Sequence, residues 1–193
     1  MTDKATDVRN REDWLQRATE LLTPMIEDAG GEVPQVRVSV GFPKGRRGRS
    51  RAIGQCWSNQ SATDGVNNLF VCPTLDDAIE VLGVLLHELI HATVGVDAGH
   101  KGPFVMMSRE VGLLRPWTAT TPGDDLRDEL TKLYEVLGAY PHQAMKVPAT
   151  RKKGSTLKLW ECECEPTVKL RVGKAEINVR CLDCGSDFLP REV

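Results

Sequence analysis

The sequence predicts an α+β protein in which a small β-sheet packs on a buried helix, followed by a small β-rich module. Residues 11–29 carry apolar side chains at the three-to-four spacing of an amphipathic helix, and residues 75–94 are apolar around the whole helix circumference. Apolar and polar residues alternate over 36–40, which predicts a strand with one buried face. Beyond residue 155, alternating apolar residues surround four cysteines. These three observations set the fold class.

Turn and capping signals place the remaining elements. We expect strands over Ala52–Ser58 and Leu69–Cys72, on either side of a turn-rich stretch. Pro73–Asp77 opens the long helix with a capping hydroxyl and acidic first-turn residues. Shorter helices fit 103–111 and 123–137.

The chain is expected to form two domains joined by a linker. The first domain covers residues 1–146, the linker covers 147–155, and residues 156–193 form the second domain. The formal net charge is −2, but it is unevenly divided, with −5 over residues 1–143 and +3 over residues 144–193. A β-rich module of about 40 residues is too short to be stable from its core alone.

Composition excludes several classes of protein. A hydrophobic content of 40% can bury a core, and the glycines and prolines follow no period, so a disordered or collagen-like chain is excluded. No apolar run reaches about 18 residues, so we expect no membrane partner. The polar start MTDKATDVRNRED lacks the apolar region of a secretory signal. We expect a cytoplasmic protein (host cytoplasm if it is phage-encoded), and a monomer is favoured.

The buried helix 75–94 contains the sequence His87-Glu88-Leu-Ile-His91. Two histidines four residues apart lie on one helix face, so both rings can reach one ion. Burying two imidazoles and a carboxylate without partners would cost several kcal/mol, and a bound zinc ion would remove most of that cost. The alternative to a metal site is that the HExxH sequence occurs here by chance.

His100 is the expected third ligand. Gly95 and Gly99 let the helix end and the chain reverse, so that His100 can return toward the metal. Three protein ligands and one open position are typical of a catalytic zinc site. Glu110 and Asp97 are rival third ligands, and an exposed loop histidine is the alternative for His100.

The segment HELIHATVGVDAGHKGPF resembles the active site of SprT-like zinc metallopeptidases, the family that includes the eukaryotic protease Spartan. HExxH is common to many families of zinc peptidases, and the continuation Gly-His-x-Gly-Pro-Phe is what points to the SprT-like family in particular. Many members have a glycine directly after Gly-His, whereas here Lys101 stands between His100 and Gly102. The resemblance therefore does not predict the conformation of the loop after His100. Similarity to phage and prophage members extends over the cysteine tail and over Trp14-Leu15, Val36–Val40, Ile53–Trp57 and Tyr140–His142.

The resemblance implies a zincin-like minimal metalloprotease domain with endopeptidase activity on a protein substrate. His87, His91 and His100 would hold the catalytic zinc, and Glu88 would be the general base and acid in peptide hydrolysis by zinc-activated water. The resemblance also implies a role near DNA, with DNA-bound proteins as substrates and DNA, single-stranded or in DNA–protein complexes, as a partner.

Two other functions stay open at this stage. One is a nucleic-acid-binding or transcription-associated protein whose HExxH helix holds a structural zinc, a site that a protein ligand such as Glu110 would close. The other is a phage-encoded protease that processes virion proteins. For a peptidase, three residues are candidates for a second electrophile beside the zinc, with an ordinary surface role as the favoured alternative for each: His142, Tyr140 and Arg115.

The tail contains Cys162-x-Cys164 and Cys181-x-x-Cys184, the spacing of a four-thiolate zinc site. Four thiolates at about 2.3 Å suit a structural zinc ion, and metal binding would supply the folding energy that the short module lacks. We therefore expect a zinc ribbon, although its first spacer has one residue instead of the usual two. Free or redox-active thiols are the alternative.

Basic residues gather in one loop of the first domain. Five of them lie within eight residues that contain no acid: Lys44, Arg46, Arg47, Arg49 and Arg51. Such a loop is a candidate for contacts with nucleic-acid phosphates, and a solvated loop is the alternative. In the tail, Trp160 either stacks on a base or forms the small core of the ribbon.

Overall fold

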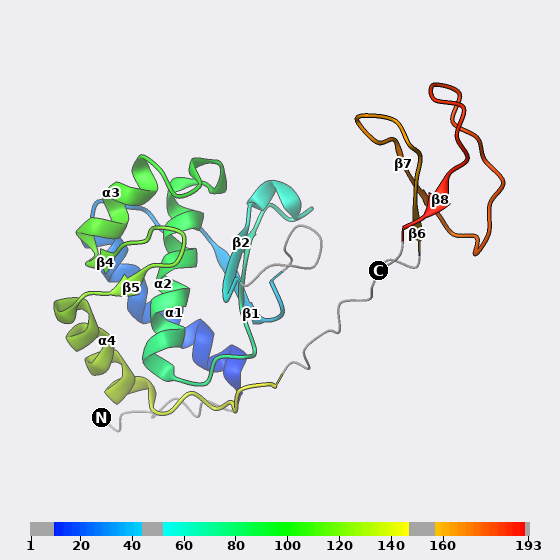
Figure 1. Cartoon of the computed structure of the whole chain (residues 1–193). Coiled ribbons are helices and arrows are strands. Elements are labelled where there is room, and N and C mark those ends of the chain that lie inside the picture. The colour runs from blue at the N-terminus through cyan, green and yellow to red at the C-terminus, as the bar shows by residue number, and fades with distance from the viewer. Residues whose placement is uncertain (1–9, 44–51, 147–156, 192–193) are drawn as a thin grey trace, which may run out of the picture. The chain divides into compact units, whose positions relative to one another are not determined.

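The computed structural model describes residues 10–43, 52–146 and 157–191. The chain divides into two compact units, Met1–Val147 and Pro148–Val193. Helices and small sheets agree with the predicted α+β class (Figure 1). The expected linker 147–155 and the basic residues from Lys44 to Arg51 lie outside the described residues. No helix in the described ranges is long and apolar enough to cross a membrane.

Four helices and five strands of the described chain make up the first unit. In chain order they are α1 (Arg11–Asp28), β1 (Val36–Val40), β2 (Gly54–Trp57), β3 (Asn67–Val71), α2 (Ala78–Val94), α3 (Pro103–Glu110), β4 (Leu113–Leu114), β5 (Thr121–Pro122) and α4 (Asp124–Leu137), with short 3₁₀ turns η2 (Asn59–Ser61) and η3 (Val96–Ala98). The predicted helices are all found. Helix α2 begins three residues later than predicted and α4 one residue later, because Asp77 and Gly123 are their N-caps, and α1 and α3 each end one residue earlier than predicted. The two-residue strands β4 and β5 were not predicted, since they are too short to carry an alternating pattern.

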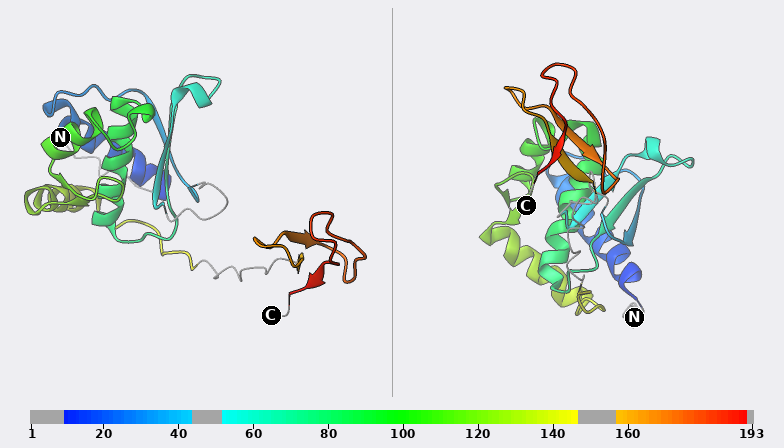
Figure 2. Two further views of the ribbon diagram at one scale, coloured as in Figure 1. Left: turned by 45° about the horizontal axis from the view of Figure 1, so that its top comes forward. Right: turned by 45° about the vertical axis from the view of Figure 1, so that its right-hand side comes forward.

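The main sheet has the strand order β1-β3-β2, with β1 parallel and β2 antiparallel to β3. Helix α2 packs on β2 and β3 of this sheet and also contacts α1, α3 and α4, while α1 packs on β1 (Figures 1 and 2). This position explains why α2 is apolar on all sides, as the sequence predicts. Strand β2, at the sheet edge, lies directly beside α2.

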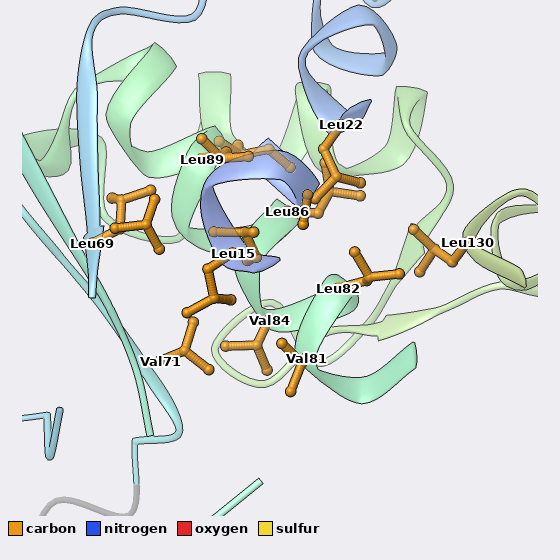
Figure 3. Packing of buried hydrophobic residues seen from close by; sticks show 14 of the residues in the cluster. Leu15, Leu22, Leu69, Val71, Val81, Leu82, Val84, Leu86, Leu89 and Leu130 are labelled. Carbon is orange, nitrogen blue, oxygen red and sulfur yellow. The ribbon is translucent and has the colours of Figure 1, made fainter. Parts of the chain in front are cut away.

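The core of the first unit is formed where α1 and β3 meet α2. Leu15 of α1 and Leu69 of β3 are fully buried, and Figure 3 shows them with the other core side chains. At the start of α1, Trp14 donates a hydrogen bond from its indole Nε1 to the Gly138 carbonyl (3.1 Å). Its ring packs edge-on against Tyr140, with centroids 4.9 Å apart. The chain after α4 is thereby tied to α1.

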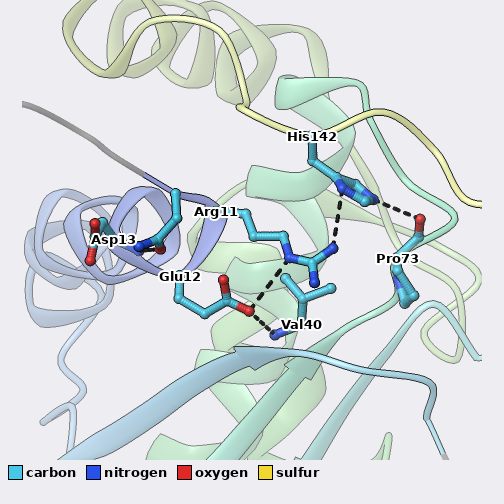
Figure 4. Close-up of polar contacts among 7 residues, drawn as sticks. Arg11, Glu12, Asp13, Val40, Pro73 and His142 are labelled. Atoms are coloured by element: carbon cyan, nitrogen blue, oxygen red, sulfur yellow. Dashed lines mark hydrogen bonds and ion pairs between the residues drawn. The ribbon is translucent and has the colours of Figure 1, made fainter.

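A network of polar contacts also joins the start of α1 to the chain after α4 (Figure 4). His142 donates from Nε2 to the Pro73 carbonyl (2.9 Å), and its Nδ1 accepts from the Arg11 guanidinium (3.2 Å). Glu12 accepts from the backbone N–H of Val40 (3.4 Å) and lies 3.5 Å from Arg11 Nε. These contacts join α1, β1 and the segment before α2, so they serve the structure of the first unit.

The second unit is a small β-rich module, as predicted. Its strands β6 (Lys158–Glu161), β7 (Lys169–Val172) and β8 (Leu189–Pro190) form an antiparallel sheet in the order β7-β6-β8. Trp160 packs in its core with Cys162, Cys181 and Phe188. Trp160 is only 5% exposed, which confirms its interpretation as a core residue of this unit.

Candidate metal centres

Three histidines predicted as metal ligands lie together in the structure. His87 and His91 project from one face of α2, and His100 reaches them from the loop that follows η3. The Nε2 atom of His100 lies 3.3 Å from Nε2 of His87 and 3.2 Å from Nε2 of His91. Tetrahedral nitrogen ligands at about 2.0–2.1 Å from one zinc ion are about 3.4 Å apart. The three ring nitrogens therefore have the spacing of ligands of a single ion.

Two glycines bring His100 back to the helix. Gly95 ends α2 with φ 89°, and Gly99 follows η3 with φ 53°. Residues with a Cβ rarely adopt such positive φ values, so glycine is what allows the chain to reverse here. The rival ligands lie elsewhere, because Asp97 and Glu110 are exposed. Within the described chain, the histidine cluster contains no carboxylate, so neither rival ligand lies with the three histidines.

Burial keeps the imidazoles neutral. It lowers the pKa of His87 to about 3, with smaller contributions from the neighbouring rings of His91 and His100. Burial also lowers the pKa of His91 to about 4, helped by His100, and it lowers the pKa of His100. Neutral imidazole is the form that coordinates metals, so the site is prepared to bind a cation near neutral pH.

Glu88 lies next to the ligand face of α2 and is also buried, with 6% of its surface exposed. Burial raises the pKa of this carboxyl group to about 8, although the backbone N–H of Cys56 donates a hydrogen bond that favours the charged form. A carboxyl group with a pKa near neutrality can both accept and donate a proton. This is the property required of a general base that later acts as an acid.

The three imidazoles share an aromatic neighbour. Phe104 of α3 is fully buried, and its ring centroid lies 4.9 Å from His87, 4.3 Å from His91 and 5.1 Å from His100. The contact with His91 is stacked, with an interplanar angle of 26°. Phe104 thus closes the inner side of the histidine cluster with an apolar surface.

The histidines and Glu88 line a cleft of about 750 Å³. Its walls come from α2, from β2 and from the segment around β5, including Gly54, Val84, Thr120 and Pro122. The residues considered as a second electrophile are not part of this lining. Tyr140 is buried against Trp14, His142 bonds Arg11 and Pro73, and Arg115 is exposed. None of these three candidates therefore lines the cleft that contains the histidines.

Four cysteines form a second cluster, in the second unit: Cys162, Cys164, Cys181 and Cys184. The sulfur atoms of Cys164 and Cys181 are 3.6 Å apart, close to the separation of about 3.8 Å between thiolates at 2.3 Å from one zinc ion. Cys164 also donates a backbone hydrogen bond to the Cys162 sulfur (3.5 Å), a contact that the one-residue spacer allows. Hydrogen bonds from Ser186 lower the pKa of Cys184 to about 6, which favours the thiolate that binds metals.

Three residues of the site were not predicted. The Thr120 hydroxyl lies 2.8 Å from Nδ1 of His87, Phe104 contacts all three histidines, and Gly54 lies against Glu88. Phe104 belongs to the Gly-Pro-Phe motif, so this motif could have indicated from the sequence that Phe104 lies at the site. Thr120 is 33 residues from His87, and no sequence pattern connects the two.

Comparison with protein-family models, with curated proteins and with solved structures finds no match to this chain. The two clusters can nevertheless be interpreted from their chemistry. One offers imidazole nitrogens beside a buried carboxyl group in a cleft, and the other offers four cysteine sulfurs in a small module. Both sets of donor atoms suit zinc, which binds nitrogen and sulfur ligands.

Proposed function

We propose that this protein is a zinc-dependent endopeptidase of the SprT-like class. Its first unit would be a zincin-like domain with a catalytic zinc on His87, His91 and His100. The observation that carries the proposal is the convergence of these three ring nitrogens in a cleft, beside the buried carboxyl group of Glu88. Three histidines and an open fourth position are typical of catalytic zinc.

The donor atoms themselves favour a bound cation. Nε2 of His100 lies within 3.3 Å of Nε2 of both helix histidines, so that one ion could be reached by all three ring nitrogens. In addition, Nδ1 of His91 is buried without a hydrogen-bond partner among the described residues. Zinc would join the three nitrogens and offset the cost of burying them.

A bound zinc ion supplies a Lewis acid for the scissile carbonyl and lowers the pKa of water to about 7. The chain's own contribution is to move the proton. Glu88 accepts a proton from the attacking water and returns it to the leaving amine. The Cys56 backbone N–H holds the Glu88 carboxylate in place, and the surrounding cleft has room for a polypeptide segment.

The second unit is proposed to be a zinc ribbon held by its four cysteines. Its small core contains only a few buried side chains, so metal binding would stabilise it. The SprT-like resemblance adds DNA-bound proteins as the substrate class, and the basic composition from Lys44 to Arg51 adds a contact for DNA phosphates. This extension rests on the resemblance and on composition alone.

A non-catalytic nucleic-acid-binding zinc protein is the second candidate. It would need a closed histidine site, for instance with Glu110 as a fourth ligand. Glu110 is exposed at the C-terminal end of α3, outside the histidine cluster, and this position favours the peptidase.

The test compares wild type, Glu88→Gln and Glu80→Gln, incubated with a basic DNA-binding protein, with and without single-stranded DNA. Glu80 is an exposed residue of the same helix that also lines the cleft, which makes it the matched control. We expect about two zinc ions per chain in all three proteins, cleavage by wild type and Glu80→Gln, and none by Glu88→Gln. Cleavage by Glu88→Gln would defeat the mechanism, and a wild type with zinc only at its cysteines would defeat the proposal.

A further inference from the structure

We propose that Thr120 is a positioning residue that fixes the ring of His87, so that Nε2 of this histidine faces the metal position. The inference rests on the proposed function, since it concerns a ligand of the same zinc. Its basis is the contact of 2.8 Å between the Thr120 hydroxyl and Nδ1 of His87. Thr120 would not touch the substrate, and it acts through His87.

Thr120 is held by a rigid support. It directly precedes β5, which pairs with β4 through Leu113↔Pro122 and Leu114↔Thr121. Pro122 packs on α2 at Gly83, one turn before His87, so closely that a Cβ on Gly83 would lie 3.1 Å from the proline Cγ. The hydroxyl of Thr120 is therefore fixed relative to the helix that carries the ligand.

A metal bound at Nε2 would determine which nitrogen of His87 carries the proton. A neutral imidazole has one N–H, and a nitrogen that binds a metal carries none. With a metal on Nε2 of His87, the proton would lie on Nδ1 and would be donated to the Thr120 hydroxyl oxygen, which is 2.8 Å away. Partners of this kind orient the ring of a metal ligand and raise its basicity.

The other helix histidine is held in a different way. Nδ1 of His91 has no hydrogen-bond partner in the described part of the chain, and its ring is stacked on Phe104. Among the described contacts, the Thr120 hydroxyl is the only hydrogen-bond partner of either helix histidine at Nδ1. Loss of this hydroxyl should therefore weaken metal binding through His87.

The test uses the full chain and four variants. Thr120→Val removes the hydroxyl at nearly constant shape, Thr120→Ala removes it with less bulk, and Thr120→Ser retains it. Thr118→Val is the matched control, because Thr118 is an exposed threonine of the same segment that also lines the cleft. Co²⁺ replaces zinc, since only the thiolate-bound ion gives intense charge-transfer absorption, and a competing chelator then measures the affinity of each site.

Thr120→Val is expected to lower Co²⁺ affinity at the histidine site by about 10- to 100-fold and to leave the cysteine site unchanged. Thr120→Ser and Thr118→Val should resemble wild type. Unchanged affinity in Thr120→Val, or in Thr120→Ala if the valine variant does not fold, would overturn the positioning role. A wild type that binds Co²⁺ only at its cysteines would instead refute the histidine site, and with it the proposed function.

Discussion

Gly54 of β2 lies directly against the carboxyl group of Glu88. A Cβ built on Gly54 would overlap Glu88 Oε1 and would lie 2.7 Å from Val84 Cγ1 and 3.0 Å from Glu88 Cδ. Two residues further along the strand, the Cys56 backbone N–H donates a hydrogen bond to Glu88. The absence of a side chain at position 54 thus lets the edge strand approach α2 closely enough to hold the proposed general base.

Gly54→Ala should therefore displace Glu88 without affecting the histidine ligands. We expect a destabilisation of about 1–3 kcal/mol from overpacking, zinc content equal to wild type, and a reduction of peptidase activity of at least about tenfold. Gly173→Ala is the control, since a Cβ there would meet only Leu157 Cδ2 at 3.6 Å. Full activity and an unchanged melting temperature in Gly54→Ala would show that Glu88 does not depend on this close approach.

The raised pKa of Glu88 predicts how the stability of the metal-free protein varies with pH. Burial raises this pKa from 4.5 to about 8, so between these values the folded state keeps a proton that the unfolded state has lost. The contribution of Glu88 to stability is fully present below pH 4.5, is lost as the pH rises toward 8, and then stays constant. Glu88→Gln lacks this titration.

With excess chelator, the melting temperature of wild type should fall relative to that of Glu88→Gln between about pH 5 and pH 8, and the difference should level off above pH 8. His87 and His91 have lowered pKa values, so they destabilise the folded state as the pH falls below 6.5, but both proteins share this effect. A difference in melting temperature that does not vary with pH would contradict the raised pKa.

Phe104 should support metal binding through its contacts with all three imidazoles. Phe104→Leu keeps the position apolar but removes the stacked ring, so we expect a loss of about 1–3 kcal/mol of stability and faster zinc release from the histidine site. Phe70→Leu is the control, because Phe70 is only partly buried and lies outside the cleft lining. If Phe104→Leu released zinc at the wild-type rate, the aromatic ring would contribute to packing alone and not to metal binding.

The second unit should depend on its metal for folding. Cys181→Ser removes a buried sulfur of the cysteine cluster and should reduce the zinc content by about one ion per chain. NMR should then show loss of the dispersed indole signal of Trp160, which lies in the core of this unit. Glu163→Gln, an exposed residue between two cysteines, should leave both measurements unchanged. A folded second unit without zinc would refute the structural role of the metal.

The sequence by itself determined the features that depend on residues near each other in the chain. Periodicity and caps predicted the four helices, because a helix satisfies its backbone hydrogen bonds locally. The spacing of His87 and His91 by four residues placed both rings on one face of α2. The four cysteines likewise follow from two short spacers in one small module.

Only the tertiary structure decided which distant residues meet. It brought His100, and not Asp97 or Glu110, to the helix histidines. It also placed Thr120 on His87 and Gly54 on Glu88, pairs separated by about thirty residues and joined through the packing of β5 and β2 on α2. Such contacts result from the arrangement of whole elements around a common core, and no local pattern of residue types encodes that arrangement.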